Sequence, residues 1–409
     1  MSHCCDGDHM VIQAVQEVDS PPAERMAAVP DPNAWPLLPP SVKLNDGVLP
    51  FITFPLLKTC NLRCAYCGTG GELSASMRSE WLLQDLLQRI PQAYAFGFRK
   101  FRLTGGEPLL YRHFDTVLSA LDQLDGVYIH LNTNGTFVRR HRDVFASSSA
   151  QLHVAVSLDS LLEEKFDSIV GRPGYFEQTI HGIQYLADIG RLLRLNMVVT
   201  NRNADEIREI IAFCRTLGCH LKLLDVVSVP LPYGHRNDIH VSLTPVESFL
   251  MEEADDIEFH EYARAFGTPC RIYVVNGVRV TVKNTWNGSR YDVSGICRGC
   301  PYFPCHEGLY DVFALPDGRV VGCRWSDSSV AARTESDRYA PTTDFHNALR
   351  EMTTVFQRAH HVARSTNSAM APNPTFVVQS LQRAIPGPGC TGGNGADSTD
   401  TRLRDRDDE

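Results

Sequence analysis

The thirteen cysteines of this 409-residue chain are the residues whose type and spacing point most directly to chemistry. Eight of them fall into two groups, Cys60, Cys64 and Cys67 near the start and Cys270, Cys297, Cys300, Cys305 and Cys323 further along. The first ten residues lack the basic and apolar regions of a signal peptide, so we expect a reducing, cytoplasmic setting. Cysteines there serve metal binding or catalysis more often than disulfides.

The first group, Cys60-x3-Cys64-x2-Cys67, directly follows the apolar run 51–57. Three thiolates on one short loop can hold three irons of a [4Fe–4S] cube and leave the fourth iron open to a small molecule. A structural zinc site is an alternative, although tetrahedral zinc needs a fourth nearby ligand. Three unrelated thiols are the other alternative.

The second group has the spacing Cys297-x2-Cys300-x4-Cys305-x17-Cys323. Four thiolates within this segment could bind zinc, as in a zinc ribbon, or a further iron–sulfur cluster. Cys270 could be a spare ligand for that metal site, but we expect it to be a small buried hydrophobic residue. A short tract with His3, Cys4, Cys5 and His9 could bind metal, but its position favours a disordered end.

The elements that must position the first group alternate between strands and helices. Strand-like runs occupy 51–57, 100–103, 127–132, 152–158, 193–199 and 220–227, and helical patterns occupy 78–94, 113–124, 138–146, 160–169, 175–189 and 204–217. This alternation predicts βα units and a parallel sheet. Six units are fewer than the eight of a closed barrel, so we predict an α/β fold with a partial, TIM-like (β/α)6 barrel.

The chain divides into four predicted parts. Residues 1–48 form an irregular leader, 49–230 the barrel, and 231–330 an extension with short strands or hairpins at 270–283 and 309–323. Residues 331–409 contain a helix near 344–360 and a Gly-, Asp- and Arg-rich tail expected to be disordered.

Composition narrows the possible partners. The formal net charge of −9 disfavours a nucleic-acid partner bound by broad phosphate neutralisation. No window holds the roughly 18 uninterrupted apolar residues of a membrane span, so we expect no membrane partner.

Four motifs in order resemble the radical S-adenosylmethionine (SAM) superfamily over about residues 51–227. The cysteine loop carries an aromatic residue, Tyr66, before its last cysteine. The other motifs are Thr104-Gly105-Gly106-Glu107-Pro108 after the second strand, Thr133-Asn134-Gly135 after the third, and Ser157 with Asp159 after the fourth. The two glycines let the backbone approach a ligand closely, and Glu107 can pair with an ammonium group.

The resemblance implies a mechanism and a set of site residues. Cys60, Cys64 and Cys67 would hold the catalytic [4Fe–4S] cluster. The SAM contacts would be Tyr66, Gly105, Gly106, Glu107, Pro108, Thr133, Asn134, Ser157 and Asp159. Electrons from an external donor, of the flavodoxin or ferredoxin type, would cleave SAM to methionine and a 5′-deoxyadenosyl radical that removes hydrogen from a substrate.

Resemblance extends to the second cysteine group. Cys305-x12-Gly318-x4-Cys323 is similar to the SPASM/twitch auxiliary-cluster modules of radical SAM enzymes. This implies a second [4Fe–4S] cluster held by Cys297, Cys300, Cys305 and Cys323.

The barrel segments are also similar to the GTP 3′,8-cyclase family, and four strand positions carry basic residues, Lys100, Arg102, Arg194 and Lys222. Strand residues that point into a barrel are usually apolar, so these four predict an anionic substrate. Outward snorkelling between the helices is the alternative.

The chain departs from the cyclases at three places. No arginine-rich stretch follows Cys300, Thr53 lies near a position where that family has a basic residue, and residues 394–409 follow the Gly392-Gly393 pair. We therefore expect a radical SAM enzyme that acts on another small anionic metabolite, such as a nucleotide, nucleoside or sugar derivative, in specialised metabolism. The alternatives are a SPASM/twitch peptide maturase, the GTP 3′,8-cyclase of molybdenum cofactor biosynthesis, and a non-enzymatic zinc-binding protein.

Overall fold

The computed structural model describes residues 49–68, 80–227, 236–260, 270–284, 311–323 and 345–354. The chain divides into two compact units, Met1–Ser365 and Thr366–Glu409, and all described residues belong to the first. The predicted leader, the tail, Cys297, Cys300, Cys305 and Gly392-Gly393 lie outside the described residues.

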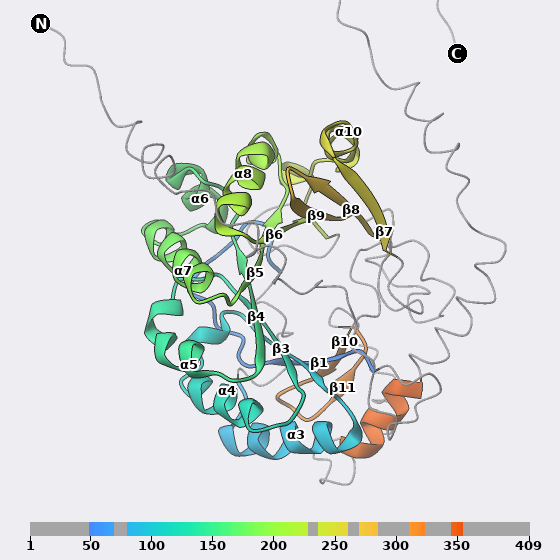
Figure 1. The fold of residues 1–409 in the computed structure, drawn as a ribbon. Coiled ribbons are helices and arrows are strands. Elements are labelled where there is room, and N and C mark those ends of the chain that lie inside the picture. The colour runs from blue at the N-terminus through green and yellow to red at the C-terminus, as the bar shows by residue number, and fades with distance from the viewer. Residues whose placement is uncertain are drawn as a thin grey trace, which may run out of the picture. The chain divides into compact units, whose positions relative to one another are not determined.

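Six parallel strands form the centre of the sheet. They are β1 (Phe51–Pro55), β2 (Lys100–Thr104), β3 (Tyr128–Thr133), β4 (Gln151–Ser157), β5 (Leu192–Val198) and β6 (His220–Leu224). Each pairs with the next in chain order. The sheet does not close on itself, which confirms the predicted partial barrel (Figure 1).

Helices follow the strands and cover the convex side of the curved sheet (Figure 1). They are α3 (Leu83–Phe96), α4 (Phe114–Asp122), α5 (Arg142–Ser147), α6 (Glu163–Val170), α7 (Phe176–Asp188) and α8 (Ile207–Leu217), with short 3-10 turns η1 (Pro108–Leu110), η2 (Val138–His141) and η3 (Ala204–Glu206). Helix α8 shows why the sequence folds this way: Ile207, Ile210, Ile211 and Cys214 recur at helical spacing and are all buried, as predicted.

Strands from beyond residue 255 extend both edges of this sheet, giving eleven strands in the described residues. At one edge β10 (Asp311–Ala314) pairs in parallel with β1, and β11 (Val320–Val321) pairs antiparallel with β10. At the other edge β9 (Val278–Lys283) pairs in parallel with β6, followed by antiparallel β8 (Cys270–Val275) and β7 (Asp256–His260). The hairpins expected at 270–283 and 309–323 are β8–β9 and β10–β11. Helices α9 (Arg236–Ile239) and α10 (Thr244–Glu253) and a helical segment at 345–354 complete the described elements.

The two faces of the sheet differ in chemistry because successive strand residues point to opposite sides. Fully buried apolar residues such as Phe54, Leu103 and Leu131 belong to the main hydrophobic core. The alternate positions are polar: Thr53, Arg102, His130 and His153 stand in register on β1 to β4. We call this polar side, which faces away from the core, the inner face.

Candidate active site

A pocket of about 290 Å³ lies at the carboxyl ends of the central strands. Its polar lining comes from the carboxyl ends of β1 to β6 and the loops that follow them, and its apolar wall includes Leu62, Phe166, Val170, Val198 and Leu224. The sequence-predicted residues that line it are Cys60, Cys64, Tyr66, Cys67, Gly105, Gly106, Glu107, Thr133, Asn134, Ser157 and Asp159. Pro108 is buried at the first position of η1 and is not among the lining residues.

The loop that carries Cys60, Cys64 and Cys67 is docked onto the end of α6. Arg63 N donates to the carbonyl oxygen of Val170 at 2.8 Å, and Ala65 N donates to that of Ile169 at 3.0 Å. The thiols are half-buried, and Leu62 N donates to Cys60 Sγ at 3.4 Å. Burial raises the pKa of Cys60 to about 12 and that of Cys64 well above its ordinary value.

The arrangement of these thiols bears on which metal group they fit. Within the described residues, no three His, Cys, Asp or Glu side chains are placed around a single metal ion. A cubane cluster makes a different demand, because each thiolate binds a different iron. Three thiols that line one pocket but do not surround a single ion therefore fit a [4Fe–4S] cluster better than a single zinc ion.

The Thr104–Pro108 segment runs beside the cysteine loop. Leu56 N donates to Thr104 O at 2.7 Å, Gly106 N to Leu57 O at 2.7 Å, and Glu107 N to Thr59 O at 2.9 Å. A Cβ on Gly106 would lie 2.3 Å from Thr59 O, and Gly105 has a φ of +152°. Both glycines also line the pocket, and a Cβ on either one would meet backbone atoms of the segment 56–59 that leads into the cysteines.

Glu107 joins this segment to the Thr133-Asn134-Gly135 turn. Its Oε1 accepts from Leu109 N at 3.0 Å and from Thr133 Oγ1 at 2.6 Å, and its Oε2 accepts from Asn134 N at 2.7 Å. Burial raises the pKa of Glu107 to about 7, although these three bonds act in the opposite direction. Each carboxylate oxygen can accept about two hydrogen bonds, so Oε2 keeps capacity for a donor in the pocket.

Asp159 fixes the orientation of Tyr66, a contact that sequence reasoning missed. Tyr66 Oη donates to Asp159 Oδ2 at 2.6 Å, and Val198 N donates to Asp159 Oδ1 at 2.9 Å. Asn203 Nδ2 donates to the Asp159 carbonyl oxygen at 2.8 Å. Burial raises the pKa of Asp159 to about 6.

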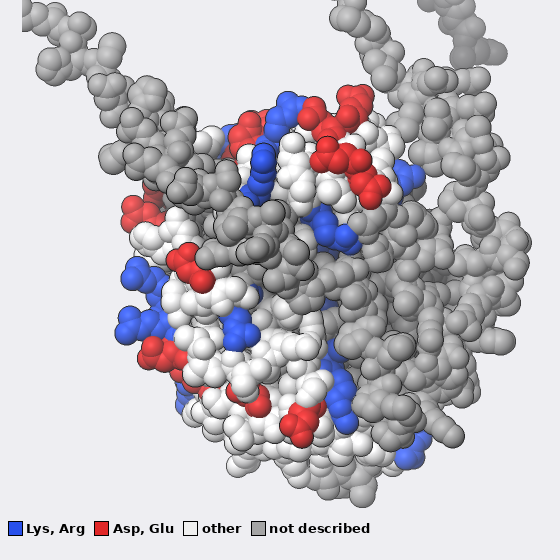
Figure 2. All heavy atoms as spheres, in the orientation of Figure 1, with Lys and Arg blue, Asp and Glu red and all other residues white. Residues whose placement is uncertain are grey.

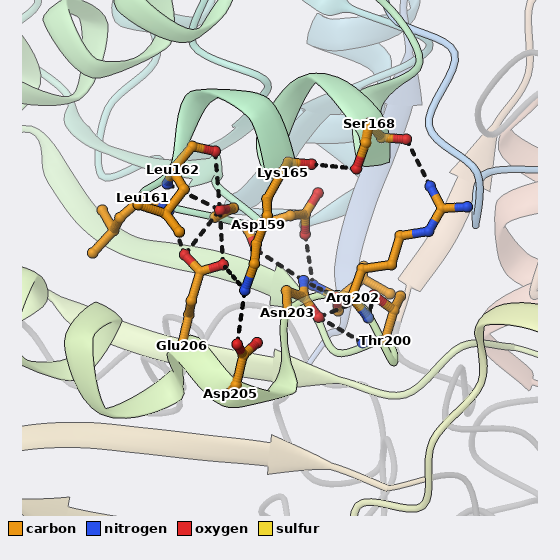
Figure 3. Close-up of polar contacts among 12 residues, drawn as sticks. Asp159, Leu161, Leu162, Lys165, Ser168, Thr200, Arg202, Asn203, Asp205 and Glu206 are labelled. Carbon is orange, nitrogen blue, oxygen red and sulfur yellow. Dashed lines mark hydrogen bonds and ion pairs between the residues drawn. The ribbon is translucent and has the colours of Figure 1, made fainter. Parts of the chain in front are cut away.

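A polar network behind Asp159 ties the loop before α6 to the loop before α8 (Figure 3). Ser160 Oγ donates to the Glu206 carboxylate, and Leu161 N donates to Glu206 Oε2 at 2.9 Å. Lys165 pairs with Asp205 at 2.8 Å and with Glu206 at 3.2 Å (Figure 3). The loop that carries Asp159, a pocket-lining residue, is therefore held by contacts between two neighbouring βα units.

The predicted basic residues cluster on the inner face. Arg194 donates from Nε to Asn196 Oδ1 at 2.9 Å, and its terminal nitrogen lies 3.2 Å from His130 Nε2. Burial, then the charges of Arg194, Arg102 and Lys222, hold the pKa of His130 well below its ordinary value. Burial also lowers the pKa of Lys100 to about 7. Arg102 pairs with Asp311, and Arg194 contacts Asn196 and His130, so neither side chain snorkels outward.

Two further residues, Cys323 and Asp225, lie at the ends of strands. Cys323 is half-buried directly after β11, but its proposed partners lie outside the described ranges. Asp225, directly after β6, lines the pocket, has a side chain that is 4% exposed, and pairs with His240 Nε2 at 3.1 Å.

The charged side chains of the described residues can be followed on one face of the protein. On the face drawn in Figure 2, basic and acidic side chains of the described residues are interspersed. Within the described ranges, no helix is both long and apolar enough to cross a membrane.

Comparison with known proteins identifies the barrel. Residues 54–214 match the model of the radical SAM superfamily. A probable GTP 3′,8-cyclase of Methanothermobacter thermautotrophicus is 26% identical over 267 residues, covering 64% of this chain and 80% of the relative. The GTP 3′,8-cyclase of Synechocystis sp. is 30% identical over 188 residues, covering 46% and 57%.

A solved structure shows the same fold. Streptococcus suis SuiB bound to S-adenosylmethionine aligns with a TM-score of 0.51 at 15% identity, covering 80% of this chain and 69% of SuiB. The relatives are named as GTP 3′,8-cyclases, so the comparisons favour an enzyme over a non-enzymatic zinc-binding protein.

Proposed function

Residues 54–214 form a radical SAM domain and the protein is an enzyme; from this premise we propose that its pocket binds a [4Fe–4S] cluster and SAM to start radical chemistry on a small anionic metabolite. When bound, the cluster and SAM supply a 5′-deoxyadenosyl radical that abstracts hydrogen. The observation that carries the proposal is that the cysteine loop, the Thr104–Pro108 segment, the Thr133–Gly135 turn and Asp159 line one pocket.

Each part of the pocket has a proposed task. Cys60, Cys64 and Cys67 hold the cluster. Glu107 accepts a hydrogen bond from the amino group of SAM with the free capacity of Oε2. The remaining contacts to SAM would come from the other predicted residues that line the pocket, Tyr66, Gly105, Gly106, Thr133, Asn134, Ser157 and Asp159. The apolar wall around Phe166 and Val198 limits the access of water.

The substrate would lie beneath the pocket, against the inner face. Arg194 and Lys222 each precede a pocket-lining residue, Asn196 and Leu224, by two positions on the same strand. Two strand residues span about 7 Å, so these cations lie one side-chain layer below the pocket. Cations at this depth favour a phosphate or carboxylate, and nucleotides, nucleosides or sugar derivatives of specialised metabolism carry such groups or are built on them.

Two further features complete the proposal. Cys297, Cys300, Cys305 and Cys323 would hold a second [4Fe–4S] cluster of the SPASM/twitch kind, and an external flavodoxin- or ferredoxin-type protein would supply electrons. The names of the relatives favour one specific second candidate, GTP 3′,8-cyclisation. Incubation with GTP, SAM and reductant distinguishes the two, because only the second candidate yields a cyclised GTP product.

Electron paramagnetic resonance of the anaerobically reconstituted, reduced enzyme tests the cluster and SAM site. We expect a cluster signal that changes when SAM is added, since SAM coordinates the open iron. Cys60→Ala should abolish the SAM-dependent change. Cys214→Ala, which alters a buried core thiol outside the pocket, should keep it. A SAM-dependent signal in Cys60→Ala would refute the proposal.

Substrate kinetics test the anion site. Arg194→Gln and Lys222→Met should each raise the KM of an anionic substrate by about tenfold or more, because a charged hydrogen bond contributes about 1.5–3 kcal/mol. The KM of SAM should change less. Arg215→Gln, on the exposed side of α8, is the matched control. Equal effects of all three substitutions would contradict an inner-face anion site.

A further inference from the structure

A buried carboxylate stands among the basic residues of the inner face. Asp311, the first residue of β10, is only 2% exposed. Its Oδ2 accepts a hydrogen bond from Thr53 Oγ1 at 2.7 Å and pairs with the Arg102 guanidinium. Thr53 and Arg102 are register partners on β1 and β2, so two inner-face residues hold one oxygen of Asp311.

The second oxygen of the Asp311 carboxylate, Oδ1, makes no hydrogen bond with a described residue. Asp311 Oδ1 and Arg102 Nε are both buried, and neither makes a hydrogen bond with any residue that the structure describes. A buried polar atom without a partner costs about 1–3 kcal/mol, and more when it is charged. The pair therefore presents one unused acceptor and one unused donor.

This pair lies in the layer below the SAM pocket. Thr104, two positions after Arg102 on β2, lines the pocket, which places Arg102 about 7 Å further down the strand. The opposite part of the inner face, on β5 and β6, carries Arg194 and Lys222. The inner face is thus cationic at β5 and β6. At its other end, the charge of Arg102 on β2 is compensated by Asp311 on β10.

We propose that Asp311 determines substrate specificity by accepting a hydrogen bond on Oδ1 from a hydroxyl group of the substrate. A hydroxyl suits the site because it can donate to Asp311 Oδ1 and accept from Arg102 Nε. The phosphate or carboxylate of the same molecule lies toward Arg194 and Lys222. This inference rests on the proposed function and narrows its substrate class to small hydroxylated anions, such as phosphorylated sugars and ribonucleotides.

Equilibrium binding of matched probes to the reconstituted, SAM-loaded enzyme tests the inference. The probes are ribose 5-phosphate with 2-deoxyribose 5-phosphate, and the four ribonucleoside 5′-monophosphates with their 2′-deoxy and 3′-deoxy counterparts. In at least one pair, calorimetry should show the hydroxylated member binding about tenfold or more tightly, since a site built for a hydroxyl rejects the analogue that lacks it.

Substitutions assign that preference to Asp311. Asp311→Asn should reduce the preference to about twofold or less, because Thr53 and Arg102 keep the amide oxygen and turn the amide nitrogen, a donor, toward the hydroxyl. Asp317→Asn, in the exposed hairpin between β10 and β11, should leave the preference unchanged. If Asp311→Asn does not fold, Thr53→Val, which frees the oxygen that Thr53 holds, should lower the same preference.

Three outcomes would overturn the inference: no probe binds, no pair shows a preference in the unsubstituted enzyme, or Asp311→Asn keeps the preference. In the last case Asp311 only neutralises Arg102. These results are separate from the proposed function, because equilibrium binding needs no reductant whereas the proposed function fails on the absence of radical chemistry.

Discussion

At the scale of single residues, two carboxylates of the candidate site accept hydrogen bonds from neighbouring protein groups in the absence of a ligand. Glu107 accepts three hydrogen bonds from neighbouring residues, and Asp159 accepts hydrogen bonds from Tyr66 Oη and Val198 N. These contacts hold two side chains of the pocket in fixed positions before a ligand binds. Such preorganisation lowers the ordering cost of binding.

Tyr66→Phe tests the contact between Tyr66 and Asp159. Removal of the hydroxyl leaves a buried carboxylate oxygen without its donor, which costs about 1–3 kcal/mol. We expect 5′-deoxyadenosine formation at subsaturating SAM to fall by about tenfold, which corresponds to 1.4 kcal/mol. Tyr185→Phe removes an exposed hydroxyl that donates to the Arg142 carbonyl oxygen, and should have no effect. Equal rates in the Tyr66 and Tyr185 variants would rule out this positioning role.

At the scale of elements, the loops after β1 and β2 act as one unit. Backbone hydrogen bonds continue past the ends of the two strands as far as Glu107 N and Thr59 O. This close approach leaves no room for a side chain at Gly106. The cysteine loop is therefore positioned by its neighbouring loop as well as by α6.

Gly106→Ala should displace the cysteine loop. The new Cβ would meet the carbonyl oxygens of Thr59 and Lys58 at 2.3 and 2.4 Å, and overpacking of this kind costs about 1–3 kcal/mol. We expect lower iron retention after anaerobic gel filtration. Gly126→Asn is the control, because no atom lies within 4 Å of its Cβ position and asparagine tolerates the left-handed backbone at φ +65°. Full iron retention in Gly106→Ala would count against the coupled loops.

Two histidines on the inner face, His130 on β3 and His153 on β4, should make the stability of the protein depend on pH. Burial and neighbouring cations hold the pKa of His130 well below 6.5, and burial lowers that of His153 to about 4. Between pH 6.5 and about 4 the unfolded chain takes up protons that the folded chain does not, so the free energy of unfolding falls as the pH falls. The slope is at most about 1.4 kcal/mol per pH unit for each histidine.

Urea unfolding across this pH range measures the effect. His153→Gln should flatten the pH dependence, whereas His181→Gln, at an exposed position on α7, should not. A His153→Gln profile parallel to that of the unsubstituted protein would show that His153 is not held neutral.

At the scale of the whole molecule, later parts of the chain extend the open sheet at both edges. Strand β10 pairs with β1, and β9 pairs with β6. The first residue of β10, Asp311, lies at the inner face, where it contacts Thr53. If Cys297, Cys300, Cys305 and Cys323 hold a second cluster, the reconstituted enzyme should contain about eight irons per chain rather than about four. Joint replacement of Cys297 and Cys300 by alanine should reduce the count to about four, and bound zinc in place of the lost iron would contradict a second cluster.

The sequence predicted local structure well and distant pairing poorly. Hydrophobic periodicity located the six central strands and the buried face of α8, because each pattern is complete within a few residues. No local signal shows that β9 and β10 join opposite edges of the sheet. The bond between Thr53 and Asp311 spans 258 positions, so Thr53 could be noticed only as a missing basic residue.

The most direct test of the central claim is the product formed from SAM under anaerobic reduction. We predict that the reconstituted enzyme with dithionite releases 5′-deoxyadenosine and methionine in equal amounts, measured by liquid chromatography and mass spectrometry. Cys60→Ala should release neither product, and Cys214→Ala should release both. The account would be contradicted if the reduced, cluster-loaded enzyme left SAM intact, or if Cys60→Ala formed 5′-deoxyadenosine at the rate of the unsubstituted enzyme.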